Sequence, residues 1–320
     1  MTQTTKRSSP TNMLQLPPVR PTFLSLPGDR LLASRLGGAS GCSVLPIASH
    51  VFPDGESCLR LCAPPITGDV AIVAMLRDPE PKLAELLLLA EAARQWGAIS
   101  VGLVAPYLPF MRQDAVMQVG EAVTARSFAK IISRSFDWLV TIDPHLHRIQ
   151  RLSEIYRIPT RALHTAPLLG QWIAKNVDQP FIVGPDVESR QWADDIAASA
   201  HAPAVVLNKT RRGDAQVSIR LPDDLDQFQG RVPVLVDDII STGTTMAATV
   251  SQLIDHGFPA PLCVAVHAVF SPGAVDAIEG AGARCVVSTN TIAHITNRID
   301  VTPLLASAVS RQTRRIAALR

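Results

Sequence analysis

The side chains best suited to chemistry stand at residues 236–245, in the sequence VDDIISTGTT. Residues 241–245 can turn hydroxyls and backbone N–H groups toward one point at the N-terminus of a helix, which suits a phosphate dianion. Gly243 has no Cβ, so the backbone there can approach the anion closely. The pattern predicts a buried strand at residues 232–236, this turn, and a helix from Thr244 onward.

Two carboxylates, Asp237 and Asp238, precede the turn and would repel a phosphate that touched them. The vicinal hydroxyls of a sugar donate hydrogen bonds to carboxylates, so a phosphorylated sugar would satisfy both halves of the motif. Ordinary capping by Ser and Thr explains the hydroxyls but not the paired acids. We therefore predict a site for a phosphorylated sugar, formed by Asp237, Asp238, Ser241, Thr242, Gly243, Thr244 and Thr245.

The segment VLVDDIISTGTT resembles the phosphoribosyl pyrophosphate loop of two families, the type I phosphoribosyltransferases and the phosphoribosyl pyrophosphate synthetases (ribose-phosphate pyrophosphokinases). The loop alone does not choose between them. Five other segments are similar to synthetase motifs and stand in that family's order: FPDGE (52–56), MRQD (111–114), DPH (143–145), GPD (184–186) and NKTRRGD (208–214). Together with the phosphate loop they cover most of the chain, so the synthetase resemblance is the stronger one.

The synthetase resemblance implies a reaction and a set of roles. The β,γ-diphosphoryl group of ATP would move to the C1 hydroxyl of ribose 5-phosphate, with AMP leaving. Lys209 and Arg211 would be the catalytic cations, while His145 and Asp186 would bind the cofactor Mg²⁺. ATP would be held by Phe52, Asp54, Glu56, Arg112, Gln113 and Asp114.

The residues themselves leave alternatives open. Arg112 presents a fork of donors suited to polyphosphate oxygens, although a solvated surface Arg fits the same pattern. His145 follows an apolar strand, where a His is either a metal ligand or a capped loop residue. His147 shares a face with His145 on an extended segment, but only His145 occupies the family's metal position. The cations at 209–212 follow the strand predicted at 204–207, in a Gly-bounded loop, a common place for function.

Departures from the family pattern indicate a diverged subclass. The best-known members carry a second Arg where Ala115 stands, two glycines within the stretch at 187–189, and often an Asp at the position of Ser241. The cations, the paired acids and the metal histidine remain. A non-catalytic regulatory subunit and a phosphoribosyltransferase are the rival functions, and retention of Lys209, Arg211 and His145 argues against the first.

Short apolar runs alternate with helical patterns along the chain, and these elements must position the motifs. Runs such as AIVAML (71–76) and VPVLV (232–236) are continuously apolar, which predicts parallel strands buried on both faces. Helices between them supply the crossovers. The predicted α/β fold has two tandem type I phosphoribosyltransferase-like domains, each a parallel sheet flanked by helices. Its divisions are a poorly ordered tail (1–20), domains at 21–161 and 162–302, and a C-terminal helix (303–320) that packs on the first domain.

Composition limits the remaining possibilities. The chain has 320 residues, a formal charge of +2 and no run of five like charges, so nucleic acid is not an expected partner. The five scattered cysteines do not form a disulfide framework. No stretch approaches the ~20 apolar residues of a membrane span. We expect a cytoplasmic enzyme that uses ATP and ribose 5-phosphate, and a homo-oligomer, at least a dimer, in which residues 52–56 complete a neighbour's ATP site.

Overall fold

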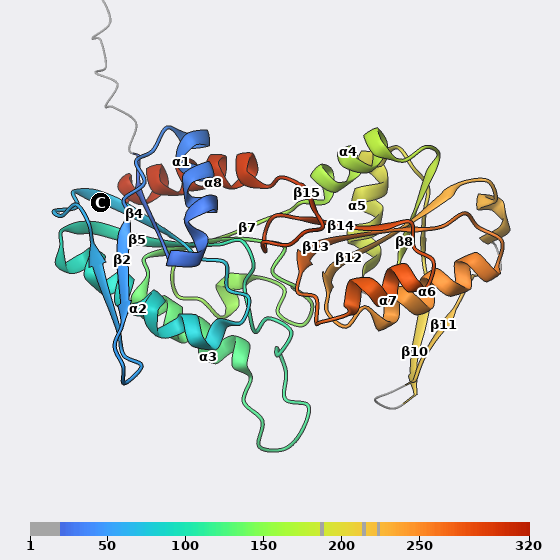
Figure 1. The fold of residues 1–320 in the computed structure, drawn as a ribbon, viewed down its shortest axis with the longest axis horizontal. Helices are drawn as coiled ribbons and strands as arrows, with labels where there is room; N and C mark the ends of the chain where they lie inside the picture. Colours follow the sequence, from blue (N-terminus) through green and yellow to red (C-terminus); the bar gives the residue numbers. More distant parts are fainter. Residues whose placement is uncertain (1–19, 186–188, 213–215, 223–224) are drawn as a thin grey trace, which may run out of the picture.

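Two lobes lie side by side in the computed structural model, which describes residues 20–185, 189–212, 216–222 and 225–320. Each lobe is a parallel sheet with helices on both faces (Figure 1). This arrangement confirms the predicted α/β fold class. The predicted tail falls almost entirely outside the described residues.

The first sheet has the strand order β1-β4-β5-β6-β7, and every neighbouring pair is parallel. Residues 70–73 and all of β6 are buried, because helices cover both faces. Helices α1 and α8 cover one face, and α2 and α3 cover the other (Figure 1). The elements are β1 (Thr22–Ser25), α1 (Arg30–Ser40), β4 (Gly68–Val73), α2 (Pro79–Gln95), β5 (Ala98–Ala105), α3 (Thr124–Ser135), β6 (Trp138–Ile142) and β7 (Thr160–Leu163).

The second sheet is also parallel, in the order β15-β14-β13-β12-β8-β9. The direction of winding reverses between β8 and β12, and ligands of such sheets gather in the crevice outside the carboxyl ends at that point. The strands are β8 (Pro180–Gly184), β9 (Ala204–Val206), β12 (Val232–Ile240), β13 (Leu262–Ala268), β14 (Cys285–Thr289) and β15 (Asn297–Ile299). The helices are α4 (Ala166–Asn176) and α5 (Arg190–Ala200) on one face, and α6 (Thr244–Asp255) and α7 (Ala274–Gly280) on the other.

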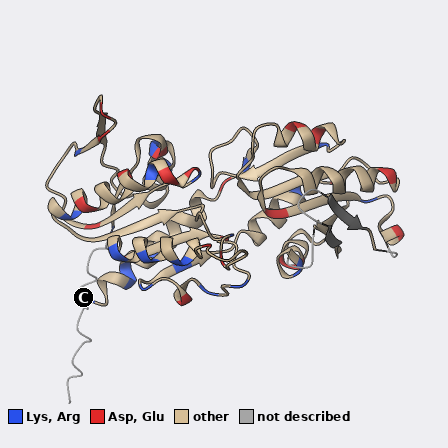
Figure 2. Cartoon of the chain, turned by 90° about the horizontal axis from the view of Figure 1, so that it is seen from below, with Lys and Arg blue, Asp and Glu red and all other residues tan. Residues whose placement is uncertain are grey.

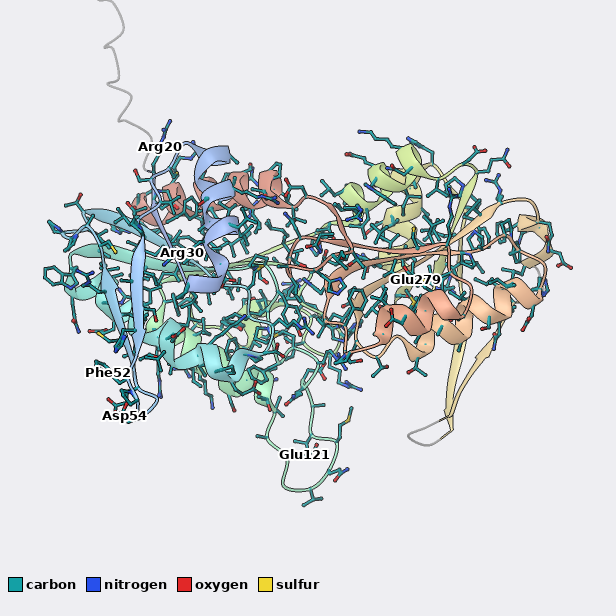
Figure 3. The ribbon with its side chains drawn as sticks, in the orientation of Figure 1. Arg20, Arg30, Phe52, Asp54, Glu121 and Glu279 are labelled. Carbon is teal, nitrogen blue, oxygen red and sulfur yellow. The ribbon has the colours of Figure 1, made fainter. Side chains whose placement is uncertain are left out.

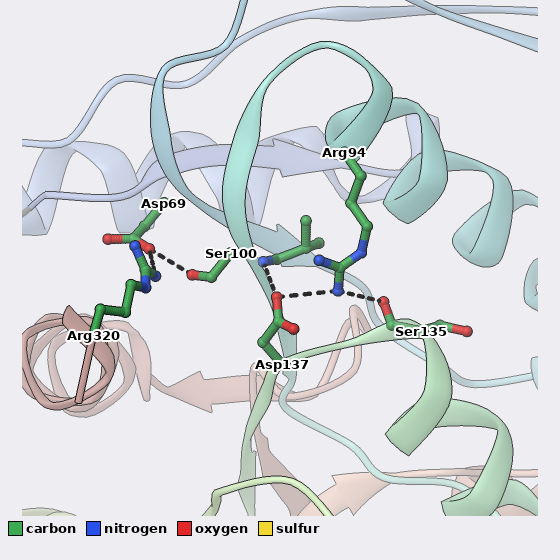
Figure 4. A network of polar contacts seen from close by, with 7 residues as sticks. Asp69, Arg94, Ser100, Ser135, Asp137 and Arg320 are labelled. Atoms are coloured by element: carbon green, nitrogen blue, oxygen red, sulfur yellow. Dashed lines mark hydrogen bonds and ion pairs between the residues drawn. The ribbon is translucent and has the colours of Figure 1, made fainter.

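The C-terminal helix α8 (Thr302–Ala317) leaves the second lobe and packs against α1, β6 and β7 of the first. Its buried face includes Leu305 and Val309. Past its end, the Arg320 guanidinium pairs with the buried carboxylate of Asp69, which also accepts a hydrogen bond of 2.5 Å from the Ser100 hydroxyl (Figure 4).

Two antiparallel ribbons project from the lobes: β2 (Ile47–Val51) with β3 (Ser57–Leu61), and β10 (Asn208–Arg212) with β11 (Gln216–Arg220). The prediction of a loop after residue 207 was wrong for the backbone, because Lys209 pairs with Ile219 and Arg211 with Val217. A polar ribbon lacks the apolar pattern by which sequence reveals a strand. Strand β7 also ends two residues beyond the predicted domain boundary at residue 161.

Charged residues of both signs are distributed along both lobes (Figure 2). This distribution accords with the formal charge of +2. All five cysteines are unpaired thiols, and Cys263 is fully buried in β13. Within the described part of the chain, no helix combines the length and apolar character needed to cross a membrane.

Candidate active site

Side chains from both sheets meet in a cavity of about 510 Å³ between the lobes. His145 and His147 come from the loop after β6, and Asp238 comes from β12. Nδ1 of His145 lies 2.5 Å from Oδ2 of Asp238, and the two imidazole rings are 4.2 Å apart between centroids. One potential ligand atom from each residue fits within 4.8 Å of the others. The cluster could therefore hold a metal ion.

The loop that carries His145 is held in an unfavourable backbone conformation. Asp143 and His145 have φ angles of 32° and 50°, in the region that favours glycine. Hydrogen bonds help to offset this backbone strain. The Asp143 carboxylate accepts one from the Thr165 backbone N–H, at 3.0 Å, and one from the Thr165 hydroxyl. His164 lies 3.2 Å from the same carboxylate. These contacts fix the direction in which His145 leaves the first sheet.

A buried histidine of the second sheet holds the same loop. Nε2 of His267, in β13, lies 3.1 Å from the carbonyl oxygen of Asp143, and Nδ1 lies 2.9 Å from the Thr291 hydroxyl. Burial lowers the pKa of His267 more than the nearby Asp143 and Asp238 raise it. A neutral ring must donate from Nε2, since a carbonyl only accepts. Sequence analysis missed His267, although a lone His in the apolar strand LCVAVHA was a usable signal.

The paired acids lie inside β12, which continues to Ile240 instead of ending at Val236 as predicted. Parallel pairing with β13 extends the strand, because Asp237 lies opposite Ala265. Burial raises the pKa of Asp238, but the hydrogen bond with His145 and the electrostatic influence of that ring lower it by more, so the pKa lies below its usual value. The Asp238 carboxylate is thus favoured in its charged form.

The predicted phosphate turn lies directly after these acids. Gly243 occupies the N-cap of α6 with a φ of 74°, and the helix begins at Thr244, as predicted. The Ser241 carbonyl accepts a hydrogen bond of 3.0 Å from the Ser271 N–H, and the Thr244 hydroxyl donates to that of Thr242. The first N–H groups of a helix have no partner within it, and the helix dipole is positive there. The turn therefore has the geometry of an anion site.

The predicted nucleotide segment lies close to Tyr107 and to Arg148, the residue after His147. Arg112 and Gln113 are exposed, and the Arg112 charge acts on Tyr107 together with that of Asp238. Burial raises the pKa of Tyr107 most, Arg112 lowers it, and Asp238 raises it further. Asp114 is buried, and its carboxylate accepts hydrogen bonds from the Arg148 side chain at 2.9 Å and the Arg148 N–H at 3.3 Å. Asp114 thus ties the nucleotide segment to the histidine loop.

The predicted residues 52–56 stand apart from this cavity. They form the tip of the β2–β3 ribbon, where Phe52 and Asp54 point away from the lobes (Figure 3). The Gly55 N–H donates to the Phe52 carbonyl, and Phe52 is 45% exposed. The tip is therefore positioned outside its own chain's cavity. Of the remaining predicted residues, Asp186 and the side chains of Lys209 and Arg211 lie outside the described part.

The donor set of the cluster can be compared with the predicted Mg²⁺. Mg²⁺ prefers oxygen ligands and usually takes one or two carboxylates, phosphate oxygens and water. The described cluster instead offers two imidazoles and one carboxylate. These three residues by themselves fit Mg²⁺ poorly.

Both lobes match domains of known protein families. Residues 22–135 match the family model of the N-terminal domain of ribose phosphate pyrophosphokinase, and residues 151–295 match that of the phosphoribosyl transferase domain. The chain is 30% identical over 281 residues to a ribose-phosphate pyrophosphokinase of Methanopyrus kandleri, covering 87% of this chain and 94% of that protein. It is 32% identical to that of Methanosarcina mazei, covering 89% and 93%.

A solved structure resembles the whole chain. The phosphoribosylpyrophosphate synthetase of Mycobacterium smegmatis superposes with a TM-score of 0.81 at 23% identity, over 92% of this chain and 99% of that one. At this identity the likeness establishes the fold. Both lobes and their relative placement are thus those of a known two-domain architecture.

Proposed function

We propose that the cavity between the lobes transfers the β,γ-diphosphoryl group of ATP to the C1 hydroxyl of ribose 5-phosphate and releases AMP. The chain belongs to the ribose-phosphate pyrophosphokinase family, which supports this reaction. One observation carries the assignment of this site. The paired acids of the second lobe, which the phosphate turn directly follows in the chain, meet the histidine loop of the first at a single cavity. A sugar phosphate held by one lobe would thus present C1 to a nucleotide held by the other.

The acceptor sugar would lie along the end of β12. Its 5-phosphate would occupy the turn at residues 241–245, where α6 begins. Asp237 and Asp238 would accept hydrogen bonds from the ribose hydroxyls, and a charged Asp238 is the stronger acceptor. This placement keeps the carboxylates away from the phosphate.

The nucleotide would approach from the first lobe. Arg112, whose charge acts on Tyr107, and Gln113 are both exposed and would contact ATP. We assign Asp114 an indirect role, because Arg148 occupies its carboxylate. Lys209 and Arg211 would stabilise the negative charge of the transferring group, since this chemistry depends on positioning and charge neutralisation more than on a covalent nucleophile.

Mg²⁺ is our proposal for the cation that accompanies ATP, as the family resemblance implies. It would be bound mainly through phosphate oxygens and water, with His145 and Asp186 as the nearest protein ligands. When bound, it would neutralise polyphosphate charge. The residues of the chain would then orient sugar and nucleotide.

The active assembly would be a homo-oligomer, at least a dimer. The exposed ribbon tip, with Phe52, Asp54 and Glu56, would complete the ATP site of a neighbouring subunit. An exposed aromatic ring at such a tip can stack on adenine, a contact worth about 1–3 kcal/mol per base. The cellular setting we propose is the cytoplasm, where the five unpaired thiols would stay reduced.

A direct assay tests this function. The protein is mixed with Mg²⁺, ATP and ribose 5-phosphate, and AMP and phosphoribosyl pyrophosphate are quantified. Both products should appear in equal amounts. Exchange with a nucleobase but no AMP would indicate a phosphoribosyltransferase, and neither reaction would indicate a regulatory subunit.

Lys209→Ala tests the catalytic assignment. Turnover should fall by about 10²–10³, the usual effect of losing one electrostatic donor, while ribose 5-phosphate affinity stays nearly unchanged. The control is Lys130→Ala, on the exposed face of α3, which should keep full turnover. Equal turnover of Lys209→Ala and the parent would remove Lys209 from the site.

A further inference from the structure

We propose that Arg77 is a positioning residue, which aligns the phosphate turn of the second lobe (residues 241–245) with the nucleotide side of the first. Arg77 follows β4, at the carboxyl edge of the first sheet, and lies outside all the motifs that indicated the family. Its Nη2 donates a hydrogen bond of 2.7 Å to the carbonyl oxygen of Phe270, in the loop after β13 of the second sheet. The effect of this contact on catalysis rests on the proposed function.

The loop that Arg77 contacts lies directly behind the phosphate turn. Ser271, the residue after Phe270, donates its backbone N–H to the Ser241 carbonyl at 3.0 Å. At the start of α7, the carbonyl oxygen of Ala274 packs so closely on Gly243 that a Cβ there would lie 2.8 Å from it. Phe270 and Ala274 are both buried, so the loop has little room to move independently of the turn. A displacement of this loop would therefore displace the phosphate turn.

The first lobe holds Arg77 at a fixed point. Met75, two residues earlier, donates its backbone N–H to Oδ2 of the buried Asp29 at 3.0 Å. The Met75 carbonyl accepts a hydrogen bond of 2.7 Å from Nζ of Lys82, in α2. The Arg77 side chain is 35% exposed, and its neighbouring carboxylate, Asp78, is 82% exposed and 3.9 Å away, which makes it a weak competitor. The guanidinium is thus directed at Phe270 from a braced segment of the first lobe.

Other contacts between the lobes act at different places. His267 and Asp238 hold the histidine loop, and Tyr107 packs against the apolar core of the second lobe. Apolar packing has no preferred direction, whereas a hydrogen bond does. Arg77 thus gives the loop behind the phosphate turn a directional contact with the first lobe. Transfer between groups held on separate lobes requires close alignment, and a misplacement of about 1 Å can cost about 10²-fold in rate.

Arg77→Met tests the positioning role by separating binding from turnover. Methionine keeps an unbranched apolar chain but removes the donor. Each substrate alone would be held mainly by one lobe, so the affinities for ribose 5-phosphate and for a non-hydrolysable ATP analogue, measured by calorimetry, should stay nearly parental. The kcat should fall at least about tenfold, because the two substrates are no longer aligned. Arg77→Lys, which keeps one charged donor, should recover part of the lost kcat.

The matched control is Arg94→Met. The Arg94 side chain is 33% exposed, nearly the same as that of Arg77, and its Nη2 lies 3.0 Å from the Asp137 carboxylate. It also donates to the Ser135 carbonyl at 3.2 Å, and all of these residues belong to the first lobe (Figure 4). Arg94→Met should lose stability through the lost contacts while keeping the parental kcat.

Amide hydrogen exchange tests the same contact without using activity. In Arg77→Met, amides within residues 270–274 and 241–245 should exchange faster than in the parent, whereas Arg94→Met should leave both segments unchanged. Parental exchange at Ser271 in Arg77→Met would overturn the proposal, as would a parental kcat.

Equal losses of kcat in Arg77→Met and Arg94→Met would also refute it, since the effect would then be one of general stability. Failure of the proposed function looks different, because the parent itself would form no AMP. Hydrogen exchange would then still decide whether Arg77 positions the phosphate turn.

Discussion

At the scale of single residues, His267 connects the two sheets by hydrogen bonds. Nε2 donates to the Asp143 carbonyl, and Nδ1 lies 2.9 Å from the Thr291 hydroxyl. Because burial lowers the pKa of His267, the unfolded chain binds its proton more readily than the folded chain does. The stability gained from a neutral His267 is complete above about pH 6.5, the ordinary pKa, and is lost as pH falls through the lower folded pKa.

His267→Phe tests this connection. The variant keeps an aromatic ring beside Tyr107, which lies 5.0 Å from His267 between centroids, but loses the donor to Asp143. Its free energy of unfolding at pH 7.5 should be about 1–2 kcal/mol below that of the parent. The gap should narrow at pH 5.5, because only the parent loses stability by protonation at this position. Chemical unfolding at both pH values measures it, and a gap independent of pH would contradict a neutral, donating His267.

At the scale of elements, the junction between β12 and α6 depends on Gly243. A Cβ there would lie 2.8 Å from the Ala274 carbonyl oxygen, and the φ of 74° is strained for any residue with a side chain. Gly243→Ala should therefore shift the turn and weaken ribose 5-phosphate binding at least about tenfold, since left-handed backbone alone costs about 1–2 kcal/mol. Calorimetric titration with ribose 5-phosphate measures the loss.

Gly273→Ala separates the effect of left-handed backbone strain from the effect of the close contact between a new Cβ and the Ala274 carbonyl. Gly273 has a similar φ of 78°, but a Cβ there meets nothing within 4 Å. This variant should lose stability from backbone strain while keeping parental affinity for ribose 5-phosphate. Unchanged affinity in Gly243→Ala would mean that the turn does not hold the phosphate.

At the scale of the whole molecule, the ribbon tip at residues 52–56 points away from its own cavity, which leaves the ATP site to be completed by another subunit. Phe52→Ala and Lys209→Ala would each be poorly active alone, for different reasons. Mixed after dissociation and reassembly, they should regain activity, because some sites then combine an intact tip with an intact Lys209. Steady-state AMP formation in the mixture measures the effect.

Dilution gives an independent check on shared sites. Specific activity should fall as the protein dissociates, and light scattering at the same concentrations reports the mass. A fully active monomer, or a mixture no more active than the average of its two variants, would contradict shared sites. Leu88→Ala, at an exposed apolar residue of α2, serves as the control for general surface effects.

The sequence by itself determined the features that depend on neighbouring residues. Continuous apolar runs predicted the buried parallel strands, and the Ser, Thr and Gly pattern predicted the turn and the start of α6 at Thr244. These follow from local preferences and the period of side-chain burial. The motifs, in their order, also indicated the family and its reaction.

Only the tertiary structure decided which distant groups meet. His145 and Asp238 are 93 positions apart and belong to different sheets, so no local pattern could pair them or bring His147 into the same cluster. The link between Asp114 and Arg148 and the role of His267 likewise arise from packing. Packing also extended β12 past Val236, because a neighbouring parallel strand supplies hydrogen bonds that the sequence of one strand does not reveal. The phosphate turn was thus readable from its own residues, whereas the cavity lined by the paired acids and the histidine loop exists only because the two lobes dock.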